Sequence, residues 1–121
     1  MFIYFARWRV PKANSIKLEE MIREILTHVR SSRERYPQLQ SAIYCSSVNS
    51  DASEEDWIWV EEYANREDYE AFYKTLKDDK EFMKIHDKKY DFWHLITKDS
   101  FKDGEYLERV RFDQSIEHRK R

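Results

Sequence analysis

Residues that break, hinge or crosslink a chain are scarce in this sequence. Its 121 residues include one glycine, two prolines and one cysteine, Cys45. So little glycine and proline argues against disordered, collagen-like and phosphate-loop segments. A single cysteine excludes a disulfide within the chain and favours a reducing compartment.

A strong net charge and a long apolar run are also missing. Lysine and arginine number 22 and aspartate and glutamate 24, so the formal net charge is -2 at pH 7. A charge this small gives no overall attraction to nucleic acid or to an anionic membrane. The first ten residues are mostly apolar but too few to cross a bilayer, and Arg7 and Arg9 interrupt them where a signal peptide would stay apolar. We therefore expect a cytoplasmic protein that binds neither membrane nor nucleic acid.

Aromatic and charged residues are what the chain has in quantity, at 16% and 38%. A chain of this length can bury one modest core without disulfides or metal ions. We expect residues 1–112 to form a single domain with a solvated, charged surface. Residues 113–121 form a charged C-terminal tail, which we expect to fray.

Strand and helix patterns follow one another in the first half of the chain. Residues 1–10, MFIYFARWRV, are rich in β-branched and aromatic residues and predict a strand. Apolar residues then recur at helical spacing behind Asn14 or Ser15, either of which can cap the helix. The patterns of residues 40–48 and 56–64 predict two further strands.

A second helix opens where Asn65 is followed three residues later by Asp68. The polar stretch LKDDKE, residues 76–81, breaks this helix. Asp78 and Glu81 have the spacing of a capping box, so they predict that the helix starts again there.

The restarted helix carries a mixed apolar stripe, followed by a further strand pattern. Four side chains of the stripe recur at helical spacing: Phe82, Met83, His86 and Tyr90. Residues 92–98, FWHLITK, then predict the fourth strand. The pattern of residues 106–112 predicts a short fifth strand or helix.

The order β-α-β-β-α-β predicts an α+β fold, the ferredoxin-like arrangement with a four-stranded antiparallel sheet. Two helices can cover only one face of such a sheet. Aromatic residues recur in all the predicted strands, so we expect Trp and Tyr on the uncovered face as well. Leaving apolar area in water costs about 25 cal/mol per Å². A second copy of the chain, a ligand or a nucleic acid is therefore expected to cover that face.

Residues 59–90, WVEEYANREDYEAFYKTLKDDKEFMKIHDKKY, carry a resemblance to a known family. A third strand ending in an acidic pair and an aromatic residue, followed by a helix that breaks and restarts, resembles the antibiotic biosynthesis monooxygenase-like group of the dimeric α/β-barrel superfamily. The resemblance extends over roughly residues 1–98. It implies a homodimer that pairs sheet to sheet, and a small aromatic or polyketide-like substrate held between sheet and helices.

Some members of this group bind and degrade haem, using an Asn on the first strand and a Trp and a His on the second helix. His86 falls at the histidine position, whereas the Asn position is Ala6 or Arg7 here and the Trp position is Phe72. Two of the three identities therefore differ, which puts haem degradation in doubt and leaves haem binding through His86. The cofactor-free oxygenases of the same group share no universal catalytic residue.

The resemblance implies one catalytic candidate, His86, as an acid, a base or an axial ligand. The same histidine can equally be a wall residue of the core. Trp8, Tyr44 and Trp59 would shape the pocket and Phe72 would pack against the ligand, although strand aromatics also make cores and dimer interfaces.

Glu61 and Glu62 are further polar candidates at the end of the third predicted strand. They point to opposite faces, so we expect one of them to face inward and the other outward. The buried carboxylate either acts as a base or pairs with Arg7 or Arg9 on a neighbouring strand, and the ion pair is our expectation. A metal site is not predicted, because the cysteine and the histidines lack ligand spacing.

The leading hypothesis is a monooxygenase-like enzyme that acts on an aromatic or polyketide-like compound or on haem, with no other cofactor implied. The alternative is a non-catalytic ligand-binding or stress-related dimeric barrel. RNA binding is a third possibility, because RNA-recognition modules share this element order, but the strand WIWVEEY is acidic and lacks their basic, glycine-containing motif.

Overall fold

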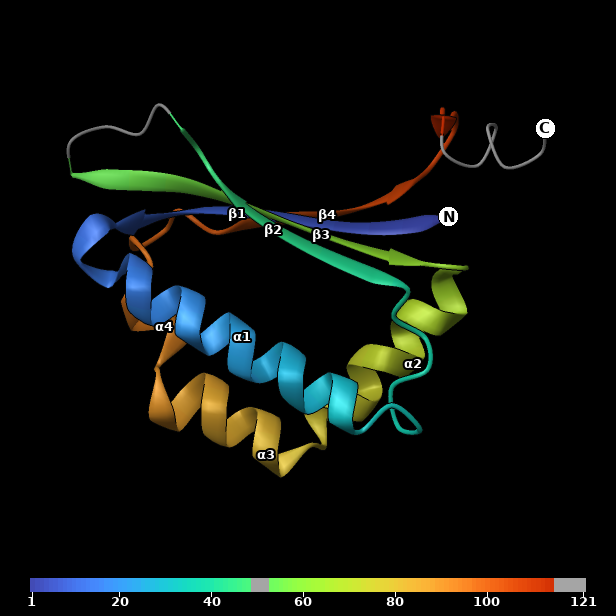
Figure 1. The fold of residues 1–121 in the computed structure, drawn as a ribbon, viewed down its shortest axis with the longest axis horizontal. Coiled ribbons are helices and arrows are strands. Elements are labelled where there is room, and N and C mark those ends of the chain that lie inside the picture. Colours follow the sequence, from blue (N-terminus) through green and yellow to red (C-terminus); the bar gives the residue numbers. More distant parts are fainter. Residues whose placement is uncertain (49–52, 115–121) are drawn as a thin grey trace.

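A four-stranded antiparallel sheet forms one layer of the molecule, seen edge-on in Figure 1. The structure is a computed structural model and describes residues 1–48 and 53–114. The strand order is β2-β3-β1-β4, so β1 pairs with both β3 and β4. The sheet is open and does not close into a barrel. Its strands are β1 (Phe2–Pro11), β2 (Ser41–Ser46), β3 (Glu54–Tyr63) and β4 (Lys102–Leu107).

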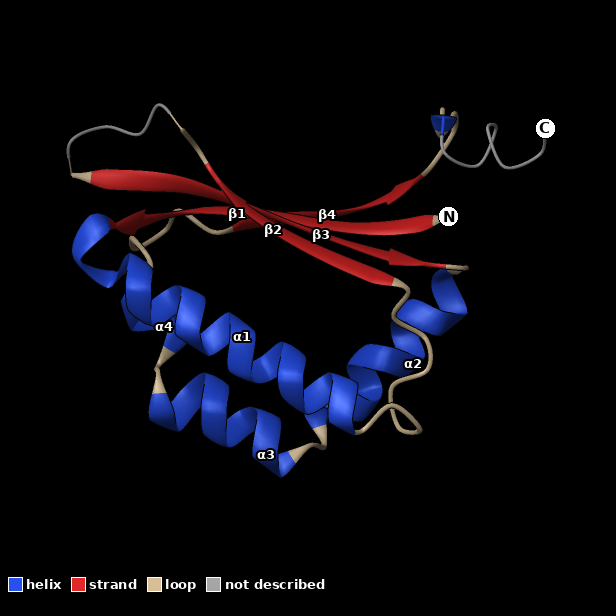
Figure 2. Ribbon diagram, in the orientation of Figure 1, coloured by secondary structure: helices blue, strands red, loops and turns tan. Residues whose placement is uncertain are grey.

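The helices that precede β4 in the chain form the second layer and all lie on the same side of the sheet (Figure 2). They are a short 3-10 turn (Lys12–Asn14), α1 (Ser15–Ser31), α2 (Arg66–Lys77), α3 (Lys80–Met83), a π-helical segment (Lys84–Lys89) and α4 (Phe92–Leu95). This two-layer arrangement confirms the predicted ferredoxin-like α+β fold. Within the described part of the chain, every helix is too short or too polar to cross a bilayer.

The predicted helix starts are only partly correct. Asn65 caps α2, and its Oδ1 accepts the backbone N–H of Asp68 at 2.8 Å. Asn14 precedes α1 but makes no cap bond, because its Nδ2 donates to the carbonyl of Leu95 at 3.0 Å. The prediction that Asp78 restarts the second helix is wrong, since the capping carboxylate belongs to the next residue, Asp79.

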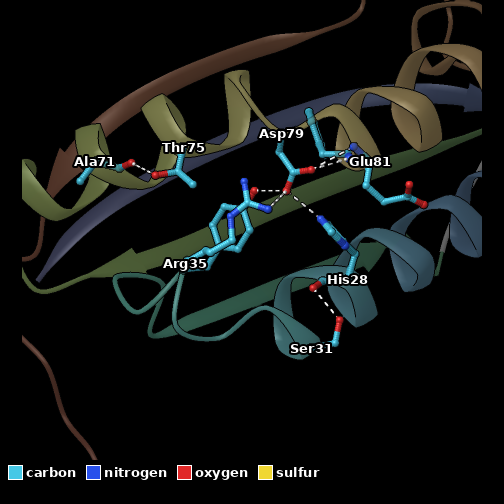
Figure 3. Close-up of polar contacts among 9 residues, drawn as sticks. His28, Ser31, Arg35, Ala71, Thr75, Asp79 and Glu81 are labelled. Atoms are coloured by element: carbon cyan, nitrogen blue, oxygen red, sulfur yellow. Dashed lines mark hydrogen bonds and ion pairs between the residues drawn. The ribbon is translucent and has the colours of Figure 1, made fainter.

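Asp79 joins three segments beneath the sheet (Figure 3). Its Oδ1 accepts the backbone N–H groups of Glu81 and Phe82 at 3.0 and 3.1 Å, which caps α3. Its Oδ2 accepts from Nε2 of His28 on α1 at 2.7 Å and from the Tyr36 hydroxyl. One buried carboxylate therefore ties the end of α1, the turn after it and the break between α2 and α3.

The prediction of a strand at residues 92–98 is wrong. Residues 92–95 form helix α4, and the last strand, β4, comes later in the chain. Burial explains the difference: Phe92 and Leu95 are buried three residues apart, while Trp93 between them is 56% exposed. That is helical spacing rather than alternation. β4 itself is polar and mostly exposed, so its apolar pattern is weak.

The tryptophans of the strands and their tyrosines Tyr4, Tyr44 and Tyr63 share the helix-covered face. The expectation that the open face carries Trp and Tyr is therefore wrong for Trp and holds for one described strand tyrosine, Tyr106. Antiparallel pairing sets Trp8 opposite Trp57, and Trp59 opposite both Ala6 and Tyr44. Directly paired residues point to the same side of a sheet. This side packs on the helices, so these rings are not available to stack bases in the manner of an RNA-recognition module.

The helix-free face is mainly aliphatic. Its apolar side chains are Ile3, Phe5, Ile43, Ile58, Val60 and Tyr106. Ile43 is 52% exposed and Ile58 is 39% exposed. The face therefore offers apolar area to a partner, but with a different composition from the one that the sequence predicts.

Candidate functional site

A cavity of about 370 Å³ lies between the sheet and the helices. This volume is in the range of small-molecule sites. The sheet supplies one wall, consisting of Tyr4, Trp8, Tyr44, Trp59, Glu61 and Asp103. Helices and loops supply the other walls, consisting of Met21, Ile22, Ile25, Leu26, Val29, Leu39, Phe72, Tyr73, Leu76, Phe82, His86, Phe92, Trp93 and Phe101. The space is thus almost entirely apolar and aromatic.

Trp59 is the centre of the aromatic wall. Its ring stacks on Tyr44 at a centroid distance of 5.3 Å and an angle of 21°. Trp8 meets it edge to face at 6.1 Å, and Tyr4 does so at 5.4 Å. Rings fixed in this way present flat, rigid surfaces to a ligand with little loss of entropy.

All five site residues suggested by the sequence line this one cavity. Trp8, Tyr44 and Trp59 come from three neighbouring strands, Phe72 from α2 and His86 from the π-helical segment. Their roles toward a ligand remain predictions. The cavity also extends along α1, so it is wider than the expected pocket between the sheet and the second helix.

The register decides which of the two first-strand residues considered from the sequence, Ala6 or Arg7, faces the cavity side of the sheet. Ala6 faces the helices and is fully buried, whereas Arg7 is exposed on the opposite face. Ala6 pairs with Trp59 on one side and with Asp103 on the other. A methyl side chain among large neighbours offers no polar group to a ligand.

His86 lies in the π-helical segment at the end of the cavity formed by α3 and α4. Its ring packs between Phe82 and Phe92, with centroids at 5.2 and 5.1 Å. Its Nδ1 lies 2.7 Å from Oδ1 of Asp87. A carboxylate at Nδ1 favours the tautomer that carries the proton there, so Nε2 is left to accept one. π-helical turns are often found at functional sites.

The predicted stripe on the restarted helix is only partly correct. Phe82 and His86 face the cavity, but Met83 is largely exposed and Tyr90 bonds through its hydroxyl to Glu24 on α1. The π-helical winding of residues 84–89 changes the angular spacing on which a regular helical stripe depends.

Glu61 is the buried acid of the sheet wall, with 3% of its surface exposed. Its Oε1 accepts hydrogen bonds from the hydroxyls of Tyr63 at 2.7 Å and Tyr73 at 2.8 Å. Burial raises the pKa of Glu61 and the two hydrogen bonds lower it. The effect of burial is larger, so the pKa is raised to about 7. The Trp59 indole N–H also lowers this pKa to a smaller extent, without reaching hydrogen-bond geometry.

The structure makes Glu61, and not Glu62, the inward-facing acid, and the expected ion pair of that acid with Arg7 or Arg9 is wrong. Both arginines lie on the helix-free face, and Arg9 pairs with Glu54 at 3.6 Å instead. The reason is register, because Glu61 pairs with Tyr4 and therefore shares its covered face. The sequence signal for this acid was a carboxylate inside an alternation of aromatic residues, Trp57, Trp59 and Tyr63.

Apart from His86, the polar groups of the described cavity lining are acids, phenols and indoles. Asp103 accepts a hydrogen bond from the hydroxyl of Tyr4 at 2.7 Å. Burial raises the pKa of Tyr44 and Tyr73 well above the usual value, so both stay neutral at pH 7. Among the described residues that line the cavity there is no lysine or arginine.

Haem fits this cavity poorly. His86 alone has the character of an axial ligand, since a histidine that binds a metal normally donates its other ring N–H to a carboxylate or carbonyl. The propionate groups of haem would meet Glu61 and Asp103 with no lining cation to offset them. In the described residues, no cluster of three His, Cys, Asp or Glu side chains could hold a metal ion.

Several solved structures have the same fold as this chain, and three of them are described as antibiotic biosynthesis monooxygenases, two of these as putative ones. No family model matches the chain, and no curated protein matches its sequence. One solved structure, a putative antibiotic biosynthesis monooxygenase from Nitrosomonas europaea, is 15% identical, with a TM-score of 0.65 over 91% of this chain and 100% of its own.

Two other similar structures have more specific descriptions. MhuD, as a point mutant with two manganese protoporphyrin IX molecules bound per active site, is 13% identical, with a TM-score of 0.59 over 93% of this chain and 99% of its own. SnoaB from Streptomyces nogalater, a cofactor-independent oxygenase, is 15% identical, with a TM-score of 0.53 over 91% of this chain and 94% of its own. The predicted resemblance is thus confirmed at the level of the fold: the chain has the ferredoxin-like fold of the antibiotic biosynthesis monooxygenase-like proteins.

Proposed function

We propose that this protein is a monooxygenase-like enzyme that binds an aromatic or polyketide-like compound in the cavity and oxidises it with dioxygen. The observation that carries the proposal is an apolar cavity of about 370 Å³ with a histidine in its wall, held by a carboxylate. Flat aromatic walls suit a fused-ring compound, and the histidine supplies the proton transfer that its oxidation needs.

The reaction needs no reductant beyond the substrate. A methylene group between aromatic rings reacts with dioxygen to give a carbonyl group and water, and atoms and electrons balance. The difficult step for such a compound is the loss of its first proton, which yields an electron-rich anion that can reduce dioxygen. A residue that accepts this proton therefore accelerates the reaction.

His86 is the proposed proton acceptor at its end of the cavity. With Nδ1 protonated and bonded to Asp87, Nε2 takes the proton and the carboxylate stabilises the imidazolium that forms. Trp8, Tyr44 and Trp59 would hold the ring system, and Phe72 on α2 would pack against it from the helix side.

Similar structures support the class of reaction. The group that shares the fold includes a cofactor-independent oxygenase and a protein with a bound metalloporphyrin. The acidic lining of the cavity favours the first of these for the present chain, because a porphyrin with propionate groups would lack a partner there.

The protein is also proposed to be a homodimer that pairs through the helix-free face of the sheet. That face carries six apolar side chains, of which Ile43 and Ile58 are substantially exposed in the single chain. A contiguous exposed apolar surface of this kind usually marks an interface.

Dioxygen uptake in the presence of dithranol, an anthrone, tests the proposed activity. We expect the protein to accelerate uptake above the rate without protein, with no added flavin, nicotinamide or metal. His86→Ala is expected to lower kcat by about 100-fold or more. His94→Ala is the matched control, because this histidine is exposed and does not line the cavity.

Two results would contradict parts of this proposal. Equal activity of His86→Ala and the wild type would remove the role of His86. Binding of the compound without accelerated uptake would favour the alternative raised by the sequence, a non-catalytic ligand-binding or stress-related protein.

A further inference from the structure

We infer that Glu61 is a second proton acceptor in the cavity and that it selects uncharged aromatic compounds bearing an acidic hydroxyl, a phenol or an enol. The inference deepens the proposed function and rests on it for one point, namely that the ligand binds in this cavity. In the step itself, the O–H bond of the ligand breaks, the proton passes to the Glu61 carboxylate, and the electron pair stays on the ligand oxygen. The products are a carboxylic acid and a phenolate.

The position of Glu61 makes it part of the ligand site. It lies in β3, two residues after Trp59 on the same face, and both side chains line the cavity. Consecutive same-face positions on a strand are about 7 Å apart, so a ring stacked near Trp59 can bring a substituent to Glu61. The hydroxyls of Tyr63 and Tyr73 hold Oε1 in place.

Every group that faces Glu61 is a neutral donor or another acid. The phenols come from all the surrounding elements: Tyr4 on β1, Tyr44 on β2, Tyr63 on β3, and Tyr69 and Tyr73 on α2. Asp103 on β4 follows at the far side of Tyr4. A buried carboxylate normally pairs with a cation. Among residues 1–48 and 53–114, the hydrogen bonds to this one come from two phenols and none comes from a cation.

This environment suits reversible proton uptake. A base is most effective when its pKa is close to the working pH, and burial places the pKa of Glu61 near 7. The neighbouring phenols do not compete, since burial raises the pKa of each of them. They can instead donate to whichever oxygen carries the charge.

The negative charges of Glu61 and Asp103 decide which ligands the cavity excludes. A carboxylate or phosphate in the cavity would lie close to Glu61 and Asp103 in an environment of low dielectric constant, where repulsion is weakly screened. An uncharged hydroxy compound has no such penalty and can donate a hydrogen bond to Glu61. Hydrogen bonds to a charged group are the stronger kind.

Calorimetric titration with three matched naphthalene compounds tests this inference without any turnover. The probes are naphthol, which is neutral and donates a hydrogen bond through its hydroxyl; naphthoate, which is an anion; and naphthylmethylammonium, which is a cation. We expect naphthol to bind the wild type at least about tenfold more tightly than naphthoate at pH 8.

The pH dependence identifies the acceptor. Between about pH 6 and about pH 8 the ionised fraction of a group with a pKa near 7 rises about tenfold, so the affinity for naphthol rises by a similar factor. Glu61→Gln should abolish this rise and narrow the discrimination against naphthoate. Glu62→Gln is the matched control, since the adjacent acid lies on the opposite face and bonds to Ser41.

Each other outcome overturns the inference. Tighter binding of naphthoate, or a pH dependence that survives in Glu61→Gln, shows that Glu61 does not accept the hydroxyl. Tightest binding of naphthylmethylammonium shows a cation site instead. If Glu61→Gln fails to fold, the order of the three affinities in the wild type still tests the inference, which requires naphthol to bind most tightly. Binding needs no dioxygen, so the two tests are independent. If the three probes bind as expected but the protein does not accelerate oxygen uptake with dithranol, the proposed function is overturned and this inference stands.

Discussion

The imidazole Nε2 of His28 lies 2.7 Å from Oδ2 of Asp79, across 51 residues of sequence. Asp79 is almost fully buried, and Arg35 approaches the same oxygen to 3.8 Å (Figure 3). This contact fixes the point at which α2 ends and α3 begins. Because α3 leads directly into the π-helical segment, the contact also helps to set the position of His86 in the cavity wall.

Replacing Asp79 by alanine is expected to lower the free energy of unfolding by about 2 to 4 kcal/mol. The change removes the cap of α3 and takes the acceptor away from the buried Tyr36 hydroxyl and from the partly buried His28 imidazole. Denaturant unfolding measures the loss. Asp78→Ala is the control, because Asp78 is exposed, and it should change stability by less than about 0.5 kcal/mol. Equal losses for the two variants would contradict the role given to Asp79.

The same contact predicts sensitivity to acid. Burial alone raises the pKa of Asp79, but hydrogen bonds from Tyr36, His28 and the Phe82 N–H outweigh it and lower the pKa to about 2. A carboxyl with a lowered pKa stabilises the fold above its unfolded value of 3.8, and this contribution is lost as the pH falls toward 2. In Asp79→Asn, stability should fall less steeply across that range.

Glu61 should make stability depend on pH in the opposite direction. Its pKa rises from 4.5 to about 7 on folding, so its protonated form is favoured in the fold. The contribution of Glu61 to stability is complete below about pH 4.5 and is lost as the pH rises to about 7. Over this range the free energy of unfolding falls by about 3 kcal/mol in total. Unfolding curves at several pH values should show this decline in the wild type. A decline of the same size in Glu61→Gln would contradict it.

The sequence predicted the layers of this fold better than its register. Alternation and helical spacing identified β1, α1, β2, β3 and α2, and the cap at Asn65 was correct. The last strand was missed because β4 is polar and exposed at the sheet edge, while the apolar stretch before it forms the short helix α4. Edge strands with one open side need little apolar patterning.

The five side chains suggested by the sequence, Trp8, Tyr44, Trp59, Phe72 and His86, all line one cavity, and their roles toward a ligand stay predictions. The partner of the inward-facing acid was predicted wrongly, because a single sequence does not reveal which residues of two strands lie opposite each other. A shift of one residue in pairing moves a side chain to the other face, and only the structure fixes that choice.

Filling the cavity should abolish ligand binding without unfolding the protein. Leu26 lines the cavity from α1, so Leu26→Phe places additional volume in the space meant for a ligand. We expect the affinity for naphthol to fall at least about tenfold, with a stability change below about 1.5 kcal/mol because the new atoms enter an existing void. Ile16→Phe, at an exposed position near the start of the same helix, is the control. Unchanged affinity in Leu26→Phe would place the ligand elsewhere.

Titration with hemin should give no shifted Soret band. The acids Glu61 and Asp103 disfavour the propionate groups, and the side chains of Ala6 and Phe72 offer them no polar atom. Absorption spectroscopy measures the outcome. A shifted band that His86→Ala abolishes would instead establish His86 as an iron ligand and revive haem as the cofactor.

A charge on the helix-free face should separate the proposed dimer into folded monomers. Ile43 pairs with Val60 across β2 and β3 on that face and is 52% exposed in the single chain. Ile43→Lys would place an unpaired ammonium group in the apolar contact, which costs several kcal/mol in an interface but little at an exposed site. Native mass spectrometry should find the wild type at twice the chain mass of 15.0 kDa and the variant at the single mass. Ile16→Lys, on α1 away from the sheet, should remain dimeric, and a wild-type protein found as a monomer would show that this face has some other partner.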